Sequence, residues 1–457
     1  MKEILEPERR IPVRAEADIL VVGGGPAGIM AAEAASKEGL KVMLIDSRTY
    51  LGGNLTIGLP VLGFLGRKGN VIIKGLPLKF VERLRAIGQA TGHRRCPLHV
   101  SLTMIGPEAA KELCMKIMEE NSVQVLLHTF CSGVIMEGKD IKGIIIESKA
   151  GREAILAKTV IDCTGDGDVA TRAGAVVKKG NLEGGMQPPT LMFSMRGINI
   201  REFRDAVANH PETYDVDIIP NEFFRKDENC TFVGMRNQIK QARNDGMKIP
   251  VERTIVMTGI ASDEMWVNMS RVNGVDGTDP ASETFGTFEA IKQNSEVVKF
   301  LKKYVPGYEN AWVDKVAPYL GARETRRIVG EYVLNRDDIL KCRRFDDAVC
   351  AASYPIDLHH PKGGDCTLEW CPDCYDIPYR CLVPKGIGNL LLAGRCISTT
   401  HEAMASTRVM SICMATGEAA GKAAKISVQS CVQPAKVDVK QLQKELKEEG
   451  VYFRSKE

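Results

Sequence analysis

The feature that most constrains the fold is a glycine-rich turn between two apolar runs near the start of the chain. An apolar run over 18–22 leads into Gly23-x-Gly25-x-x-Gly28, an alanine-rich stretch over 29–37 and a second apolar run over 41–45. Short apolar runs are typical of buried parallel strands, and the alanine-rich stretch is typical of a helix. Residues 17–46 therefore predict a strand–helix–strand unit.

The turn in this unit suits the pyrophosphate of a dinucleotide. Gly23 permits the tight turn, Gly25 lets the backbone approach a pyrophosphate, and Gly28 allows the helix to pack closely on the strand. The helix N-terminus then offers free N–H groups to the phosphates, and Asp46 can accept both hydroxyls of the adenosine ribose. The alternative, a glycine-rich turn without a nucleotide, does not account for the acid. The predicted contacts are Gly23, Gly25, Pro26, Ala27, Gly28, Asp46 and Ser47.

A second glycine pair favours FAD over NAD as the cofactor. Gly52, Gly53 and Asn54 follow soon after the acidic strand, where they let the backbone run beside a longer cofactor. The apolar run that ends in Gly394 and Arg395 points the same way, because FAD is held at both ends of such chains. No second strand–GxGxxG–helix unit is seen, which argues against a two-dinucleotide reductase of the glutathione reductase type.

With these motifs the sequence resembles the FAD-dependent oxidoreductases related to the flavoprotein subunits of fumarate reductase and succinate dehydrogenase. The resemblance covers nearly the whole chain and is specific for family and cofactor, but it does not name a substrate. The segments that carry it are 23–28, 160–168, 267–279, 320–330, 377–384, 393–398 and 408–410.

The resemblance implies positions for several further cofactor contacts. It places Thr164, Gly165 and Asp166 near the ADP moiety, and Gly394 with Arg395 near the ribityl chain and phosphate. It also implies that a helix starting near residue 408 points its N-terminus at the flavin pyrimidine, where the helix would stabilise the negative charge of reduced flavin. Relatives of fumarate reductase often carry an acid where this chain has an arginine after the glycine.

The predicted fold class is α/β: a discontinuous Rossmann-type FAD-binding domain with an inserted α+β substrate domain. The first part of the FAD-binding domain is expected over 15–184 and its second part over 346–430, with the inserted domain at 185–345 and a helical tail at 431–457. Expected helices are 107–121, 200–209, 232–244, 280–303, 406–426 and 441–450. Expected strands are 123–128, 132–136, 141–148 and 154–157 as a meander, then 160–163, 265–269 and 328–334.

The candidate catalytic residues are His401, Arg408 and Arg380. His401 and Arg408 lie seven residues apart after the ribityl-binding turn, where we expect them to flank the flavin. Histidine titrates near neutral pH and suits proton transfer, whereas arginine stays charged and suits a carboxylate. Phosphate or capping contacts are the alternative role. A further basic cluster that could bind an anionic substrate, or lie on a solvated face, is Arg323, Arg326 and Arg327.

These observations favour an enzyme that moves a hydride between flavin N5 and a carbon of a small organic molecule, for which an anionic substrate is one option. The alternative is an electron-transfer flavoprotein subunit that acts only in a complex with an unidentified electron donor or acceptor. The two differ in whether the purified protein alone turns over a substrate.

Charge and hydropathy exclude other classes of partner. The net charge is +3, from 61 basic and 58 acidic residues, which gives no reason to invoke nucleic acid or a membrane surface. No apolar run approaches the ~20 residues that cross a bilayer, and the charged start of the chain lacks a signal-peptide core. We therefore expect a cytoplasmic protein whose 14 cysteines are mostly reduced.

Two groups of residues raise the question of a metal. Cys366, Cys371, Cys374 and Cys381 begin like the ligand run of a plant-type [2Fe–2S] protein, but their last gap is too short for that class. Free thiols are the preferred interpretation, with an iron–sulfur or zinc site as the alternative. The pair at 359–360 is adjacent, so on a strand the two histidines point in opposite directions. No metal is predicted.

Overall fold

The computed structural model describes residues 3–36, 39–215, 221–226, 231–364 and 366–454. Its described residues form a seven-stranded sheet in the order β6-β2-β1-β9-β8-β7, with β21 paired to β9. Strands β6, β2, β1, β9 and β21 are parallel, whereas β7 and β8 form an antiparallel edge with β9. The strands are β1 (Val13–Val22), β2 (Val42–Ile45), β6 (Gln124–Leu126), β7 (Phe130–Glu137), β8 (Asp140–Ser148), β9 (Gly151–Asp162) and β21 (Leu390–Leu392).

The strand–helix–strand unit predicted at 17–46 is confirmed. Helix α1 (Pro26–Ala35) joins β1 to β2, and the second half of β1 and all of β2 are buried. A strand buried on both faces reads as a continuous apolar run, as this segment does. Strand β1 begins earlier than predicted, at Val13. The predicted end of the helix at Lys37 lies outside the described residues.

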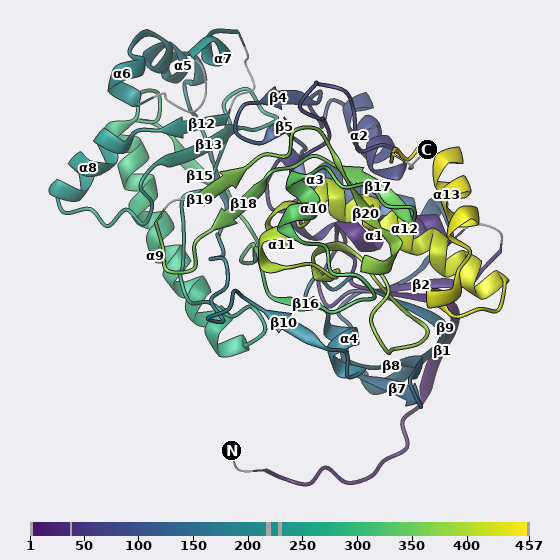
Figure 1. The fold of residues 1–457 in the computed structure, drawn as a ribbon. Helices are drawn as coiled ribbons and strands as arrows, with labels where there is room; N and C mark the ends of the chain where they lie inside the picture. The colour runs from purple at the N-terminus through teal and green to yellow at the C-terminus, as the bar shows by residue number, and fades with distance from the viewer. Residues whose placement is uncertain (1–2, 37–38, 216–220, 227–230, 365, 455–457) are drawn as a thin grey trace.

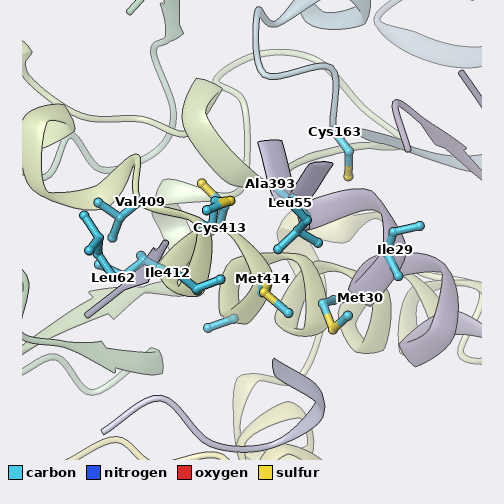
Figure 2. Packing of buried hydrophobic residues seen from close by; sticks show 14 of the residues in the cluster. Ile29, Met30, Leu55, Leu62, Cys163, Ala393, Val409, Ile412, Cys413 and Met414 are labelled. Carbon is cyan, nitrogen blue, oxygen red and sulfur yellow. The ribbon is translucent and has the colours of Figure 1, made fainter. Parts of the chain in front are cut away.

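Helix α1 packs directly on helix α12 (Met410–Gln429) without large side chains between their backbones. A Cβ added at Gly417 would lie 2.1 Å from the Ala27 carbonyl oxygen, and one added at Gly421 would lie 2.3 Å from that of Ala31. The two glycines therefore fix how closely the helices approach. Figure 2 shows Met30 of α1 and Met414 of α12 within the same buried cluster.

After β21 the chain forms two helices, where the sequence predicted a single helix at 406–426. Helix α11 (His401–Thr407) stops at Arg408, and Val409 is extended before α12 begins at Met410. Thr400 caps α11, since its side chain accepts from the Ala403 amide. The break matters because it creates a new helix N-terminus at Met410.

The predicted meander is correct for three of its strands and wrong for the first. Strands β7, β8 and β9 are antiparallel neighbours, but β6 pairs in parallel with β2 on the far side of the sheet. The runs predicted separately at 154–157 and 160–163 are one long strand, β9, which pairs with β1 along its length. The alternation of apolar and polar residues identified the strands, but the pairing partner of β6 is set by the crossover through helix α3 (Pro107–Glu120).

A second sheet of five strands, in the order β12-β13-β14-β11-β15, is formed by described residues between 193 and 316. In Figure 1 it lies beside the first sheet with α5, α6, α7 and α8 at its outer end. The helix predicted at 232–244 is wrong in its first turn, which belongs to a strand. The elements here are β11 (Phe193–Arg196), β12 (Thr231–Gly234), β13 (Thr254–Thr258), β14 (Met265–Val267), β15 (Trp312–Val316), α5 (Ile200–Asn209), α6 (Pro211–Tyr214), α7 (Asn221–Lys226), α8 (Arg236–Asn244) and α9 (Pro280–Tyr304).

The remaining elements connect or flank the two sheets. The strand predicted at 328–334 is mostly wrong, because β16 ends at Ile328. The helices are α2 (Leu76–Ala86), α3 (Pro107–Glu120), α4 (Asp168–Arg172), α10 (Arg336–Leu340) and α13 (Val439–Glu448). The strands are β3 (Val61–Leu62), β4 (Arg94–Cys96), β5 (Val100–Thr103), β10 (Val177–Lys179), β16 (Arg326–Ile328), β17 (Ala348–Ala352), β18 (Ile356–His359), β19 (Cys366–Glu369) and β20 (Tyr375–Pro378).

The packing of α1 on α12 predicts that Gly417→Ala destabilises the protein by about 1–3 kcal/mol, the usual cost of overpacking. The added methyl would meet the backbone of Ala27, which cannot move without shifting α1. Chemical denaturation measures the loss. Gly92→Ala is the matched control, because no atom lies within 4 Å of its added Cβ. Equal stability of the two variants would show that the helices do not depend on this glycine.

Candidate active site

A cavity of about 580 Å³ opens at the carboxyl ends of β1, β2 and β9 and extends under the second sheet. Its walls include Val22, Ile45 and Cys163 at the strand ends, and Ile255 and Met257 of β13. Ligands of open α/β sheets bind outside the carboxyl ends of the strands. The cavity therefore lies where the fold predicts a cofactor and where the second sheet can cover a substrate.

The glycine turn forms one end of this cavity with the geometry predicted for it. Gly23 has φ +103°, and a Cβ there would lie 2.6 Å from the Cys163 carbonyl oxygen. A Cβ at Gly28 would lie 1.8 Å from the Gly23 carbonyl oxygen, whereas one at Gly25 would meet no atom within 4 Å. Gly23 and Gly28 thus serve the turn and the packing, and Gly25 leaves the space that a pyrophosphate needs. Pro26 and Ala27 also line the cavity.

The N-terminus of α1 is available to bind phosphate. Its N-cap residue, Gly25, supplies no side-chain acceptor, and its first turn carries no acidic residue. The first N–H groups of a helix have no partner within the helix and attract anions.

Asp46 closes the same end of the cavity. Its Oδ2 accepts from the Gly24 amide at 2.6 Å and its Oδ1 from the Arg48 amide at 2.8 Å. These bonds fix the carboxylate at the end of β2, next to Ser47, with further lone pairs on both oxygens for a ribose.

The second glycine pair lies directly against the dinucleotide turn. The Gly52 amide donates to the Gly24 carbonyl at 2.8 Å, and a Cβ at Gly53 would lie 2.8 Å from the Gly25 Cα. Gly53 and Asn54 line the cavity. Only glycine permits this approach, so the pair extends the cofactor cradle beyond the first turn.

The segment at 164–166 meets Arg395 across the cavity wall. The Arg395 Nε donates to the Gly165 carbonyl at 3.0 Å, and its Nη2 forms an ion pair with Asp166. Thr164, Gly165, Asp166, Gly394 and Arg395 all line the cavity. The arginine that departs from the family pattern is thus neutralised by an acid from another part of the chain.

The N-terminus of α12 also opens onto the cavity. Val409, Met410 and Cys413 line it, and Val409 as N-cap provides no side-chain acceptor for the first-turn N–H groups. A helix of 20 residues presents a substantial partial positive charge at this point. Two helix N-termini therefore face one cavity, which fits a cofactor with a pyrophosphate and a ring that becomes negative on reduction.

Comparison with known families agrees with this geometry. Residues 18–446 match the family described as FAD dependent oxidoreductase. The chain belongs to this family. Its cofactor is therefore FAD, and the glycine turn, Asp46 and the two helix N-termini are the features that fit it.

Curated relatives match shorter segments of this FAD-dependent oxidoreductase. A thiamine thiazole synthase of Aeropyrum pernix is 27% identical over 168 residues, which is 34% of this chain and 57% of that protein. A sarcosine oxidase subunit alpha of a Corynebacterium species is 54% identical over 43 residues, 9% of this chain and 4% of that protein. The chain thus spans little more than half of the first relative and a small part of the second.

Among solved structures, a geranylgeranyl bacteriochlorophyll reductase-like protein of Thermoplasma acidophilum superposes with a TM-score of 0.48 at 16% identity, covering 95% of this chain and 84% of that one. The flavin-dependent brominase Bmp2 superposes with a TM-score of 0.45 at 13% identity, covering 95% of this chain and 83% of that one.

The other half of the cavity carries a group of arginines beneath the second sheet. Arg253, Ile255 and Met257 alternate along β13 and the residue before it, so their side chains share the face that lines the cavity. Arg323 and Arg408 line the same region from other segments. We call Arg253, Arg323 and Arg408 the arginine cluster.

Arg323 has only neutral hydrogen-bond acceptors in the described part of the chain. Its Nη1 donates to the Pro188 carbonyl at 2.5 Å and to the Thr190 hydroxyl at 2.8 Å. Burial, reinforced by the positive charges of Arg408 and Arg271, lowers the pKa of the Arg323 guanidinium to about 9. Both burial and the neighbouring positive charges disfavour the charged guanidinium, so an anion beside Arg323 would stabilise it.

Asp357 organises the floor of the arginine cluster. Its Oδ2 accepts from the Tyr354 hydroxyl at 3.1 Å and lies 3.4 Å from Arg408 Nη2, and its Oδ1 lies 3.4 Å from His359 Nε2. Although burial alone would raise it, a hydrogen bond from His359 and the positive charge of Arg408 hold the pKa of Asp357 well below its usual range. Burial, followed by the charge of Arg323, lowers the pKa of His359 to about 3. Asp357 is thus a fixed negative charge beside a neutral imidazole.

The structure places two of the predicted catalytic residues away from the cavity lining. His401 is buried with its Nδ1 2.8 Å from Glu324 Oε1, and it begins helix α11 instead of lying on a loop. Arg380 pairs with Asp347 at 2.9 Å and its side chain is 49% exposed. Arg408, at the end of α11, is the predicted catalytic residue that lines the cavity. Arg326 also lines it but pairs with Asp168, and Arg327 pairs with Glu324.

Sequence reasoning missed His99, Tyr354, Asp357 and Arg253, all of which line the cavity. They belong to no local motif. Backbone strain beside His99 is visible only in the structure: Val100 has φ +64°, and the Ser101 amide donates to the His99 carbonyl at 2.7 Å. A β-branched residue at positive φ is a genuine outlier, and such strain concentrates at functional sites.

The four cysteines of the metal hypothesis separate in the structure. Cys366 lines the cavity, with Arg253 Nη2 3.3 Å from its Sγ, whereas Cys371, Cys374 and Cys381 are buried elsewhere. Within the described residues no group of three or more His, Cys, Asp or Glu side chains could hold a metal. His359 points inward and His360 bonds to Thr367 at the surface. None of the helices in the described part of the chain is long and apolar enough to span a membrane.

Asp46→Ala should weaken FAD binding about 10- to 100-fold, the loss expected for hydrogen bonds to a charged group. Because this carboxylate faces the adenosine end of the cavity, binding of FMN should change much less. Titration of the apoprotein followed by flavin fluorescence measures both. Asp46→Asn keeps one acceptor oxygen, so its affinity for FAD should lie between those of the wild type and Asp46→Ala. Equal losses for FAD and FMN would show that the substitution acts by loosening the turn.

Proposed function

We propose that this FAD-dependent oxidoreductase transfers a hydride between flavin N5 and a carbon of a small anionic organic substrate held by the arginine cluster. FAD, when bound, supplies the two-electron acceptor and donor. The arginine cluster supports the anionic character of the substrate, and its position in the same cavity as the cofactor cradle supports direct transfer between the two.

The observation that carries this proposal is the presence of two guanidinium groups, those of Arg323 and Arg408, in one cavity. The Arg408 side chain is 12% exposed and lies 3.4 Å from Asp357. Arg323 has only neutral hydrogen-bond acceptors among the described residues, and buried charges are costly unless they are paired. The guanidinium fork matches a carboxylate with two parallel hydrogen bonds. A carboxylate on the substrate would complete this charge balance.

Residues of the chain itself would bind the substrate, hold the binding groups in place and exclude water. Arg323, held by Pro188 and Thr190 in the segment between β15 and β16, would bind the anionic group from one side. Asp357 holds Arg408 and Tyr354 in place at the other side. Ile255 and Met257 give the cavity an apolar roof that excludes water, which strengthens the electrostatic contacts beneath it. Holding the reacting carbon close to the flavin is the main rate advantage of such a site.

The test is an anaerobic screen of the holoenzyme with hydroxy acids, amino acids and unsaturated acids. Compounds that bleach the flavin absorbance, or restore it after photoreduction, are substrates. Arg323→Gln should then lower kcat/KM about 10- to 100-fold through the lost charged hydrogen bonds, with FAD content unchanged. Arg323→Lys, which keeps the charge but not the fork, should recover only part of this loss.

Arg201→Gln on α5 is the matched control, since this side chain is 93% exposed. Uncharged analogues of the best substrate should have a low kcat/KM with the wild type, and Arg323→Gln should not lower that value further. Turnover that is indifferent to the substrate's charge would contradict the proposal. Turnover that appears only after a partner protein is added would favour the electron-transfer subunit instead.

A further inference from the structure

A histidine that the sequence did not single out faces the arginine cluster from the β4–β5 hairpin. His99 lines the cavity, and its ring lies parallel to that of Tyr354, with an interplanar angle of 3° and centroids 6.3 Å apart. Its electrostatic neighbours are Asp357, Arg253 and Arg408. His99 therefore lies where an anionic substrate held by the cluster would meet an imidazole.

The β4–β5 hairpin holds the His99 ring through one of its two nitrogens, Nδ1. The Nδ1 of His99 lies 3.6 Å from the Sγ of Cys96, and the His99 amide donates to the same sulfur at 3.4 Å. A thiol can both donate and accept, so it supports either protonation state of Nδ1. Within the described residues Nε2, on the opposite edge of the ring, has no hydrogen-bond partner.

The other histidines near the cavity are already engaged. His359 accepts from Arg271 Nη2 at its Nδ1, 2.7 Å away, and its Nε2 faces Asp357. An imidazole nitrogen that accepts from an arginine cannot also carry a proton, so His359 is a positioning residue. His401 is held by Glu324 outside the cavity lining. His99 is thus the imidazole at the arginine cluster with a nitrogen available to a ligand.

We propose that His99 Nε2 takes up and releases the proton that accompanies hydride transfer; this rests on the function proposed above. In the oxidation direction a C–H bond of the substrate breaks, its hydrogen and electron pair pass to the flavin, and the proton lost from the adjacent substrate atom passes to Nε2. Two electrons and one hydrogen thus reach the cofactor, and one proton reaches the imidazole. Reduction of the substrate is the reverse.

The charges around His99 favour uptake of a proton by the imidazole once an anionic substrate has bound. Burial, with Arg253 and Arg408 nearby and Asp357 opposing them, lowers the pKa of His99 below its ordinary value. The ring is therefore neutral at pH 7 and can act as a base. Tyr354 and Cys96 also face the ring, and burial raises the pKa of both, so they stay uncharged. An anion on the arginine cluster would offset the positive charges and raise the pKa of His99.

The test combines NMR with kinetics on the FAD-loaded enzyme. The seven histidines are labelled with 13C at Cε1, and the His99 resonance is identified by its loss in His99→Asn. It should titrate below the ordinary pH range of histidine, and malonate, used as the anionic probe, should move that titration upward. Malonate should also perturb the flavin spectrum. With a substrate from the screen, His99→Asn should lower kcat about 10²-fold or more and remove the acidic limb of the kcat/KM pH profile.

Matched variants separate the possible outcomes. His210→Asn, whose side chain is 65% exposed, should leave rate and pH profile unchanged. Cys96→Ser replaces the sulfur that contacts Nδ1 and the His99 amide, and it should shift the His99 resonance. It also assigns that resonance if His99→Asn fails to hold FAD. Cys366→Ser should keep the pH limb, since this thiol is another titratable group in the cavity.

If malonate perturbs the flavin but leaves the His99 resonance unmoved, or if His99→Asn keeps its rate and pH limb, the role of His99 is wrong and the anion site stands. If malonate changes neither the flavin spectrum nor any histidine resonance and the screen finds no charge-dependent turnover, the arginine cluster does not bind anions. In that case the proposed function fails, and the role of His99 fails with it.

Discussion

The contact between α1 and α12 is the constraint on which the rest of the active site depends. Gly417 and Gly421 let α12 approach the backbone of α1 at Ala27 and Ala31, and a side chain at either glycine would push the helices apart. Because the helices are held this closely, the N-terminus of each reaches the same cavity. One end suits the pyrophosphate and the other a flavin ring that becomes negative on reduction.

The break between α11 and α12 serves the same purpose. A single helix through 401–429 would have placed its N-terminus at His401, which lies outside the cavity lining and pairs with Glu324. The extended Val409 starts a new helix at the cavity and leaves Arg408 at the end of the old one. One local change of backbone direction thus brings both a helix N-terminus and the Arg408 guanidinium to the cavity lining.

Charge is distributed along the cavity in a way that separates cofactor from substrate. In the cofactor half of the cavity the cationic Arg395 is neutralised by Asp166, and Asp46 is held by backbone amides. Under the second sheet Asp357 pairs with Arg408 of the arginine cluster. Arg253 immediately precedes β13, whereas Arg323 and Arg408 come from two other segments, so the cluster exists only in the folded chain. The anion binding that we propose depends on all three segments.

The cofactor half of the site was readable from the sequence because each of its features is local. The strand, the glycine turn, the helix and Asp46 lie within 17–46, and their spacing follows from strand and helix geometry alone. The same holds for α5, predicted and found at 200–209. Strand β6 was misplaced because its pattern gives a strand but not a partner, and the helix predicted at 406–426 was wrong because nothing in its composition marks Val409 as extended.

By itself, the sequence determined the family, the cofactor and the contiguous segment that binds its adenosine end. Only the tertiary structure decided which side chains line the half of the cavity where we propose that the substrate binds. His99, Arg253, Arg323, Tyr354 and Arg408 come from separate segments, and no spacing along the chain encodes their meeting. His401 and Arg380 looked equally suitable by residue type, yet burial beside Glu324 and exposure beside Asp347 keep them from the cavity. The physical reason is that hydrogen-bonding patterns within a strand or helix are local, whereas the charge balance of a buried site depends on every element that closes over it.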